Sequence, residues 1–298
     1  AKYHEQSDQW SALKLGFAEK SYSVLDDIVS AALTSAGVDG AKLVQIGCNN
    51  GREILSTFSL GARRGLGLDQ SQQFLQQAQT LQAISGHNCQ FLCRDIYALP
   101  NNIEQDFDIA LITIGVLNWM PDLIRFFEIA AGLLRPDGHM LVYETHTFLE
   151  MFDPESTTPH TPTFSYFKTQ PHVETGLITY DGEKIANPGK SYWFPHQLGA
   201  IVSAITAAGL QIAKLEEFPH SIHEVEYDIF VGQSAQLPMS YLLQARKLLV
   251  RQAWRQQNTT AQTSYWCRFL LFKHPFAFRS QHEQPCQQTR YCAPTRSK

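Results

Sequence analysis

The chain has 298 residues, of which 44% are hydrophobic and only 17% charged, and its formal net charge at pH 7 is −4. Such a chain buries one substantial core, and it is long for a single α/β domain, which leaves room for a lid and extensions. No apolar run reaches the roughly 18 to 20 residues that cross a bilayer, and the first residues lack the pattern of a secretory signal, so we predict a cytoplasmic protein without a membrane partner.

The six cysteines do not form a disulfide framework. They lack paired C-x-x-C spacing, so they predict no zinc site, and unpaired thiols suit a reducing compartment. A polar cluster near residue 220 also lacks the H-x-x-x-H pattern of a metal-binding helix. Its members are Glu216, Glu217, His220, His223 and Glu224. We therefore predict no metal ion.

The first 40 residues are predicted to form an N-terminal helical cap. Four aromatic side chains precede a predicted helix over residues 24–33, whose apolar face would pack on a sheet. These aromatic residues are Tyr3, Trp10, Phe17 and Tyr22.

Residues 42–51 read as a short β-strand that ends in a glycine loop. Gly47 and Gly51 allow a tight turn close to a ligand, and Asn49 tolerates a left-handed backbone. A second short strand ends in Asp69, which is placed to accept hydrogen bonds from a ribose diol. This order is typical of the opening of a doubly wound α/β domain and predicts a nucleotide-cofactor pocket. An ordinary tight turn beside a surface aspartate is the simpler alternative.

Three further elements follow in the same α/β pattern. Residues 91–97 form a third strand end, residues 107–114 a fourth strand, and residues 133–144 a helix end, a turn and a fifth strand. The order of these elements resembles that of class I S-adenosylmethionine-dependent methyltransferases over roughly residues 40–248. The chain looks most like their small-molecule branch, whose members carry Leu-Leu-Arg-Pro-x-Gly before the fifth strand, as residues 133–138 do.

The resemblance implies a Rossmann-like, doubly wound sheet of seven strands, mostly parallel with an antiparallel last strand, and an inserted substrate lid. It also implies S-adenosylmethionine as the cofactor and methyl transfer to a small-molecule acceptor by in-line displacement. By analogy alone, the N-terminal segment would close over the cofactor. The methyltransferase domain would then span residues 41–248.

The resemblance assigns the first loop to the methionine part of the cofactor through Gly47, Asn49 and Gly51. Asp69 would bind the ribose hydroxyls, with the adjacent Gln70 also among the cofactor-binding residues. The departure from the family pattern is Asn49, which stands where the family usually has its middle glycine. Because asparagine adopts the same backbone conformation, the motif is weakened but kept.

The resemblance also assigns residues at the third and fourth strand ends. Asp95 and Ile96 would contact the adenine. Ile114 and Gly115 would line the floor beneath the sulfonium, with residues 118–119 close by.

The segment over residues 146–196 is rich in aromatic, proline and histidine residues, and we interpret it as the lid. A hairpin over residues 173–193, turning at Asp181-Gly182, would cover the pocket. If the acceptor must lose a proton, His146 at the end of the fifth strand is our first candidate for the general base. His196, at the start of a predicted helix over residues 197–208, is the second. A packing or capping role is the alternative for each histidine.

Residues 239–246 are predicted to be the last strand, paired with residues 210–218. Helical periodicity over residues 241–250 competes with this assignment, because a short apolar run fits either structure.

Beyond residue 248 the composition changes. From residue 235 to the end there are ten lysines or arginines against one acid, Glu283. We predict that residues 249–298 form a basic, poorly ordered extension, with a nucleic-acid or membrane-facing arm as the competing interpretation.

Other function classes fit less well. The nicotinamide fingerprint needs a glycine where Asn49 stands, and residues 113–116 lack the Asp/Asn-Pro-Pro-aromatic motif of nucleobase amino-methyltransferases. We therefore expect no nucleic-acid substrate, and the sequence does not fix the oligomeric state. A catalytically silent Rossmann-like binding module, whose basic tail contacts nucleic acid, remains the alternative to the enzyme.

Overall fold

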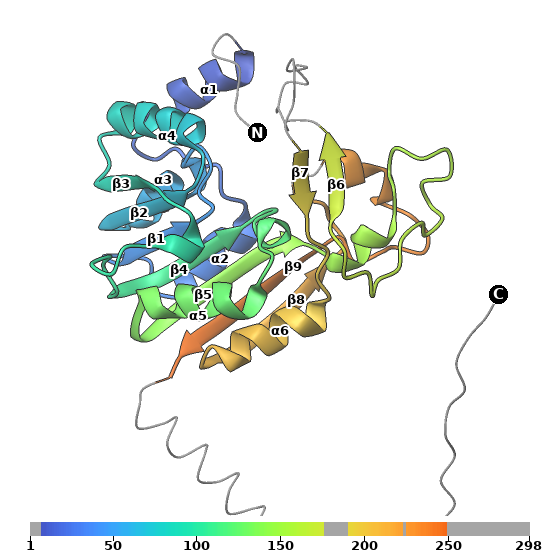
Figure 1. Ribbon diagram of the computed structural model, residues 1–298. Coiled ribbons are helices and arrows are strands. Elements are labelled where there is room, and N and C mark those ends of the chain that lie inside the picture. The colour runs from blue at the N-terminus through green and yellow to red at the C-terminus, as the bar shows by residue number, and fades with distance from the viewer. Residues whose placement is uncertain (1–6, 176–189, 223–224, 249–298) are drawn as a thin grey trace, which may run out of the picture. The chain divides into compact units, whose positions relative to one another are not determined.

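The computed structural model describes residues 7–175, 190–222 and 225–248 (Figure 1). Within these residues, one sheet of seven strands has the order β3-β2-β1-β4-β5-β9-β8. The strands are β1 (Lys42–Ile46), β2 (Arg64–Asp69), β3 (Cys89–Cys93), β4 (Phe107–Thr113), β5 (Leu134–Thr145), β8 (Leu210–Phe218) and β9 (Ser240–Lys247). Strand β9 runs antiparallel to both β5 and β8, and the pairs among β1 to β5 are parallel. The predicted α/β, Rossmann-like sheet is confirmed.

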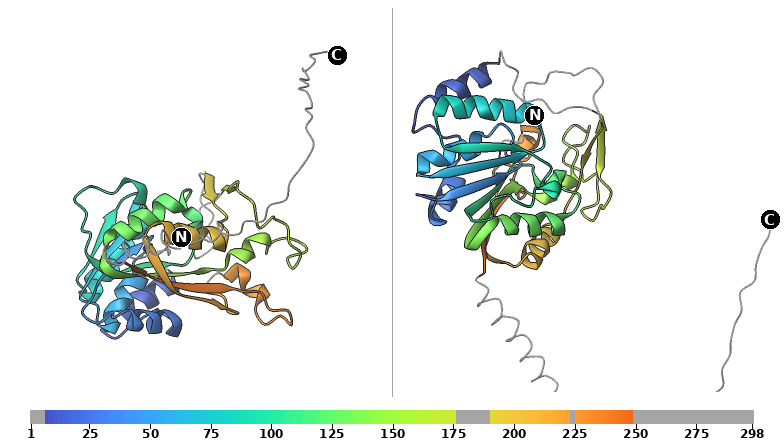
Figure 2. Two further views of the ribbon diagram at one scale, coloured as in Figure 1. Left: turned by 90° about the horizontal axis from the view of Figure 1, so that it is seen from below. Right: turned by 60° about the vertical axis from the view of Figure 1, so that its left-hand side comes forward.

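Helices cover both faces of this sheet (Figures 1 and 2). One face carries α2 (Asp27–Ser35), α3 (Arg52–Ser56), η1 (Thr57–Leu60) and α4 (Gln72–Ser85), and the other carries α5 (Leu123–Leu133) and α6 (Leu198–Ala207). Strand β4 lies in the middle, with Ile109 and Leu111 facing α2 while Ala110 and Ile112 face α5. Burial on both faces explains why residues 109–112 of this strand are all apolar.

The helix starts follow local capping rules. Asp26 accepts a hydrogen bond from the Val29 amide at 2.8 Å and so caps α2, as is usual for an aspartate at an N-cap. Helix α3 begins differently, because its N-cap is Gly51 in a left-handed conformation. The glycine loop therefore runs directly from β1 into a helix.

The predicted N-terminal helix forms with slightly shifted bounds. The helix predicted over residues 24–33 begins only at Asp27, because Asp26 forms the cap. Trp10 and Phe17 precede that helix and lie within a further helix that was not predicted, α1 (Asp8–Phe17), where both are buried. They pack against α3 and α4 through an apolar cluster that includes Leu81. Tyr3 lies outside the described residues.

The last strand forms as predicted, so the helical alternative is wrong for the described residues 240–247. In β9, Tyr241 and Leu243 face the α5 side of the sheet, and Leu242 faces the α2 side. Because both faces are covered, successive residues are apolar and imitate a helical pattern.

The region after β5 contains several short elements. They are η4 (Thr147–Met151), β6 (His172–Thr175) and β7 (Lys190–Trp193), followed after β8 by η5 (Val225–Phe230). Strands β6 and β7 pair antiparallel, with Val173 opposite Tyr192, which agrees with the predicted hairpin. The Asp181-Gly182 turn lies outside the described residues, as does the 249–298 extension.

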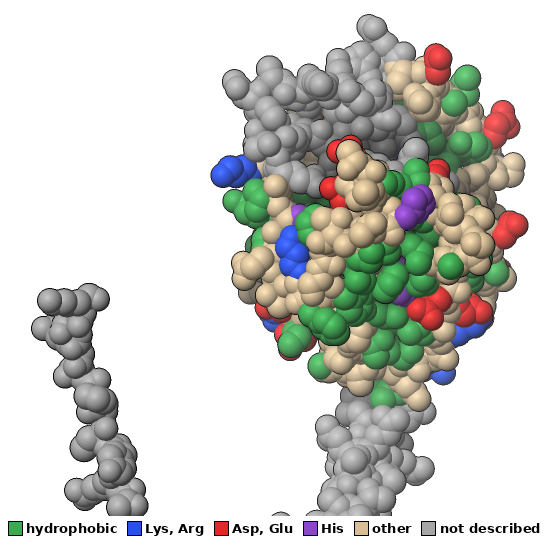
Figure 3. Space-filling model, turned by 90° about the vertical axis from the view of Figure 1, so that its right-hand side faces the viewer, with side chains coloured by type: hydrophobic (Ala, Val, Ile, Leu, Met, Phe, Trp, Pro, Cys, Tyr) green, Lys and Arg blue, Asp and Glu red, His purple; other side chains and the backbone are tan. Residues whose placement is uncertain are grey.

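Apolar side chains gather on the face of the molecule that this region presents (Figure 3). The exposed large apolar residues of this part of the chain are Phe167, Val173, Tyr192, Ile229 and Val231. In the part of the chain that the structure describes, no helix has both the length and the apolar character needed to cross a membrane.

Candidate cofactor and acceptor site

The predicted site residues follow the carboxyl ends of the parallel strands. Strands β1, β2, β3, β4 and β5 run in one direction, so the segments that leave them meet at one edge of the sheet. In open α/β sheets this edge, where the strand order reverses between β1 and β4, is where ligands bind. The fold therefore places the predicted cofactor residues on one side of the molecule.

The loop after β1 is left-handed at three positions. The φ angles are 67° at Gly47, 50° at Asn49 and 75° at Gly51. Asn49 thus adopts the conformation for which the family usually has a glycine. Backbone bonds close the loop, since the Cys48 amide donates to the Leu68 carbonyl at 2.9 Å and the Gly51 amide to the Cys48 carbonyl at 2.8 Å.

Packing also requires the two glycines of this loop. A Cβ atom at Gly47 would lie 2.7 Å and 3.1 Å from the two γ carbons of Val116, which follows β4. At Gly51 it would lie 2.6 Å from the ring of Phe91, on β3. We predicted these glycines from ligand approach, but contact with neighbouring side chains already disfavours a Cβ atom at both.

Asp69, at the end of β2, fixes the loop after β1 and can still accept further hydrogen bonds. Its Oδ2 accepts the Asn49 amide and its Oδ1 accepts the Ser71 amide, both at 2.8 Å. Burial raises the pKa of this carboxyl above its ordinary value, although the amide bonds lower it. A carboxylate has about four acceptor positions, so a ribose diol still finds acceptors here. Gln70 beside it is exposed.

A third feature of this loop fits a bound cofactor. The side-chain nitrogen of Asn50 is buried and has no hydrogen-bond partner among the described residues. Buried polar groups normally have partners. The left-handed loop, the Asp69 carboxylate and this amide together fit a ligand that carries both ribose hydroxyls and a carboxylate, as S-adenosylmethionine does.

The two residues predicted to contact adenine differ in exposure. Asp95 is exposed, and its carboxylate accepts the Tyr97 amide at 2.9 Å to cap η2 (Ile96–Ala98). Ile96 is buried in the core on the α5 side, with only 6% of its surface exposed. Ile96 therefore has little surface for a ligand.

The segment after β4 has an unusual backbone. Ile114 has a φ of 43° and Gly115 a φ of 79°, directly before η3 (Leu117–Trp119). A positive φ is a genuine outlier for a β-branched residue. The Ile114 amide donates to the Tyr143 carbonyl at 2.9 Å, which ties the segment to β5.

The end of β7 is bonded to this same segment. The Phe194 amide donates to the Asn118 carbonyl at 2.7 Å, and the Asn118 side chain donates back to the Phe194 carbonyl at 3.2 Å. The Trp193 indole donates to both Glu150 carboxylate oxygens at 2.9 Å. The rings of Trp119 and Trp193 meet edge to face with centroids 5.6 Å apart. The region between β5 and α6 therefore stands beside the end of β4.

His146 is enclosed by partners. Its Nδ1 accepts the Phe148 amide at 3.1 Å, so the proton is on Nε2, which contacts Glu217 Oε1 at 2.8 Å. Burial lowers the pKa of this imidazole, and the carboxylate of Glu217 opposes that shift. In this neutral form the lone pair already accepts an amide, and the side chain caps η4.

His196 lies beside η3. Its Nε2 is 2.8 Å from the Met120 carbonyl oxygen, which only accepts, so Nε2 carries the proton and Nδ1 the lone pair. Burial lowers the pKa of His196, while the backbone contacts raise it. The neutral imidazole in this tautomer has the form a base requires.

Two carboxylates of this region were not predicted as site residues. Glu150 bonds Trp193 and also accepts the Asn118 side chain at 3.2 Å. Glu144, on β5, bonds the backbone after β4. Neither belongs to a recognisable spacing motif, because each partner is distant in the sequence. For Glu144, the one feature of the sequence that could have indicated a site residue is its position near the end of a predicted strand.

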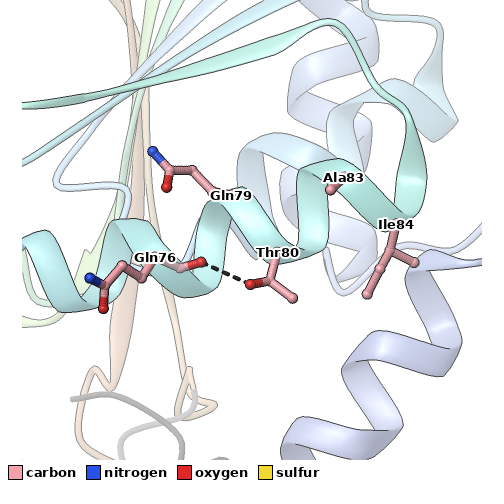
Figure 4. Close-up of a pocket in the computed structure, with 5 residues that line it drawn as sticks. All are labelled: Gln76, Gln79, Thr80, Ala83 and Ile84. Atoms are coloured by element: carbon pink, nitrogen blue, oxygen red, sulfur yellow. Dashed lines mark hydrogen bonds between the residues drawn. The ribbon is translucent and has the colours of Figure 1, made fainter.

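A shallow hollow on the outer side of α4 contains no ionisable side chain (Figure 4). It is lined by Gln76, Gln79, Thr80, Ala83 and Ile84. Among residues 7–175, 190–222 and 225–248, no group of three or more His, Cys, Asp or Glu side chains is arranged to hold a metal ion. Within the predicted polar cluster, Glu217 bonds His146, and His220 contacts the Tyr143 hydroxyl.

Comparison with known proteins agrees with this geometry. Residues 44–142 match the family model described as a methyltransferase domain, whereas no curated protein matches the chain. The fold is similar to an S-adenosylmethionine-dependent methyltransferase from Mesorhizobium loti, at 19% identity and a TM-score of 0.51, over 73% of this chain and 96% of that one. It is also similar to one from Clostridium acetobutylicum, at 14% identity and a TM-score of 0.51, over 76% and 94%.

A third similar structure is the [4+2]-cyclase SpnF, at 16% identity and a TM-score of 0.50, over 84% of this chain and 97% of that one. At such identities these likenesses establish the fold, and the family model establishes the domain. The family model therefore identifies residues 44–142 as a methyltransferase domain, within a fold shared with S-adenosylmethionine-dependent methyltransferases.

Proposed function

We propose that this enzyme transfers the methyl group of S-adenosylmethionine to a small-molecule acceptor by in-line displacement. The observation that carries the proposal is the pair of bonds between Phe194 and Asn118, at 2.7 Å and 3.2 Å. They hold the segment after β7 beside the end of β4, where the donor sulfonium would lie. Covering the acceptor side in this way favours a small acceptor over a macromolecule.

The proposed donor site follows the loop geometry. Gly47, Asn49 and Gly51 lie beneath the methionine part, and Asp69 binds the ribose hydroxyls beside Gln70. The left-handed φ of Asn49 and the acceptor capacity of Asp69 support this assignment.

Farther along the same edge, Asp95 faces the adenine, and Ile96 supports it from the core. Ile114 and Gly115 form the floor beneath the sulfonium. Their positive φ angles, next to the first loop, support this placement.

The protein contributes alignment and exclusion of water rather than covalent chemistry. S-adenosylmethionine supplies an activated methyl group when bound, so orientation of the acceptor lone pair is the main requirement. Trp119 and Trp193 provide aromatic surface on the acceptor side, and Glu150 fixes the Trp193 indole. Aromatic faces also attract a sulfonium cation.

Where the acceptor must lose a proton, we propose His196 as the base in preference to His146. The Nδ1 lone pair of His146 accepts the Phe148 amide and its Nε2 contacts Glu217, which supports a positioning role. His196 donates from Nε2 to Met120 beside η3, which leaves the Nδ1 lone pair to act as a base.

The test uses the full chain with tritium-labelled methyl donor and a cell extract separated by size. Label in the low-mass fraction, absent with Asp69→Ala, supports the proposal. Label in RNA or protein contradicts it. Binding of S-adenosylhomocysteine without any transfer supports the alternative, a silent module whose 249–298 segment contacts nucleic acid.

A cytoplasmic location is part of the same proposal. The cysteines at positions 48, 89 and 93 are free thiols, which suits a reducing compartment. The similar [4+2]-cyclase structure has the same fold, and one fold can host several chemistries. Methyl transfer must therefore be measured directly.

A further inference from the structure

The carboxylate of Glu144 receives an unusual set of hydrogen bonds. Glu144 lies near the end of β5 and is only 2% exposed. Its two oxygens accept the amides of three consecutive residues after β4: Gly115, Val116 at 2.9 Å and Leu117 at 3.2 Å. A buried ionised group needs such partners, and here the backbone of one turn supplies them.

The turn that Glu144 holds is strained. Ile114 has a φ of 43°, although a β-branched side chain disfavours the left-handed region, and Gly115 follows at 79°. Such conformations persist only when the surroundings over-determine them. The bonds to Glu144 point the next three amides at one carboxylate and so select this conformation.

The same turn touches the cofactor loop. The γ carbons of Val116 fill the space beside Gly47, where a Cβ atom would approach to 2.7 Å. A change in the conformation of the turn would therefore move side chains that pack against the loop under the methionine part of the cofactor.

We propose that Glu144 is a positioning residue for cofactor binding, which acts by fixing the 114–117 turn in its left-handed conformation. The inference rests on the proposed placement of the cofactor over this turn. Glu144 acts through the backbone rather than on the reacting atoms, since its oxygens face the amides of the turn.

The test compares Glu144→Gln with Tyr143→Phe, its neighbour on β5. A glutamine side chain has only one acceptor oxygen, and its NH₂ group would face an amide donor. Tyr143→Phe removes a buried hydroxyl that donates to Asp26 at 2.8 Å and lies 3.0 Å from His220. Both variants lose buried hydrogen bonds, but only Glu144→Gln changes the turn.

The measurements are the Kd of S-adenosylhomocysteine by calorimetry and amide hydrogen exchange at residues 115–117. For Glu144→Gln we expect Kd to rise by about 10-fold or more, the low end for bonds to a charged group, with exchange faster at these amides. For Tyr143→Phe we expect a lower Tm with Kd within about twofold of the wild type and unchanged exchange at the turn.

A second-site variant separates positioning from general damage. Because glycine adopts a positive φ at no steric cost, Glu144→Gln should weaken binding less when it is made in an Ile114→Gly background, with Ile114→Gly alone as the reference. Should Glu144→Gln not fold, Glu144→Asp keeps the charge but shortens the reach, and we expect weaker binding with partial exchange protection.

Three results would overturn the inference: near wild-type Kd in the folded Glu144 variants, equal weakening by Tyr143→Phe, or the same loss of affinity from Glu144→Gln with and without Ile114→Gly. If the wild type itself does not bind S-adenosylhomocysteine, the proposed cofactor placement fails first. If the wild type binds and the Glu144 variants bind equally well, only the role of Glu144 fails.

Discussion

Replacing Gly47 with alanine tests the geometry of the cofactor loop most directly. The new Cβ atom meets Val116 at 2.7 Å and 3.1 Å, and the position has a φ of 67°. Two independent costs therefore add: a left-handed backbone for an L-residue, and overpacking against a side chain on the neighbouring turn.

Each cost has a known scale. The left-handed conformation costs about 1–2 kcal/mol for a residue with a Cβ, and overpacking typically costs about 1–3 kcal/mol. We expect Gly47→Ala to lower the free energy of unfolding by about 2–5 kcal/mol, which leaves a typical domain folded. Since Val116 must move, we also expect weaker binding of S-adenosylhomocysteine.

Gly209 is the matched control. It has a φ of 80° after α6, and nothing lies within 4 Å of the place its Cβ would occupy. Gly209→Ala therefore carries only the backbone cost of about 1–2 kcal/mol. It lies before β8, at the opposite edge of the sheet from the cofactor loop, so cofactor affinity should not change.

Urea unfolding of the two variants measures both costs, and Val116→Ala completes a double-mutant cycle. Removing the γ carbons should recover the overpacking part, about 1–3 kcal/mol, in the Gly47→Ala background. The reasoning is refuted if Gly47→Ala is no more destabilising than Gly209→Ala, or if Val116→Ala gives no recovery.

Three further outcomes are expected. Burial raises the pKa of Asp69. As the pH is lowered, the affinity for S-adenosylhomocysteine should therefore begin to fall at a higher pH than it would with an ordinary aspartate. Asp69→Asn should bind about 10-fold or more weakly and should not show this pH dependence. Trp193→Phe removes the donor to Glu150, so labelled transfer to the low-mass fraction should slow while the Kd of S-adenosylhomocysteine stays constant; a changed Kd would contradict this separation. Burial lowers the pKa of several histidines in the folded protein, so below about pH 6.5 the unfolded chain binds more protons than the folded one. The free energy of unfolding should therefore decrease from pH 8 to pH 5.5. A urea midpoint that does not change with pH would contradict this prediction. These histidines are His87, His139, His146, His172 and His196.

The sheet and the cofactor loop could be predicted because their signals are local. The run from Lys42 to Gly51 contains a buried strand and a turn that needs left-handed residues, and both appear in the structure. The antiparallel β9 was harder, since its two buried faces make the sequence consistent with a helix as well. The resemblance to a known family decided between them correctly.

The histidines and carboxylates could not be ranked from sequence because their partners are far apart. His146 stands at a strand end like a candidate base, yet Glu217, 71 residues later, occupies one of its nitrogens. Glu144 looked like an ordinary acid, and its three amide donors lie 27 to 29 residues earlier. Such contacts depend on the register of neighbouring strands, which no short motif encodes.

The turn after β4 explains why donor and acceptor sites need not be independent. Val116 packs against Gly47 of the cofactor loop, the amides after Ile114 are held by Glu144, and Asn118 is bonded to Phe194. One five-residue segment, 114–118, thus contacts the cofactor loop, the last parallel strand of the β1–β5 series and the region between β5 and α6. Because in-line transfer requires donor and acceptor to be aligned within a fraction of an ångström, one rigid segment that touches both sides performs this alignment more reliably than two separate loops. The strained φ of Ile114 is then a cost that the fold sustains through Glu144 in order to keep that segment in a single conformation.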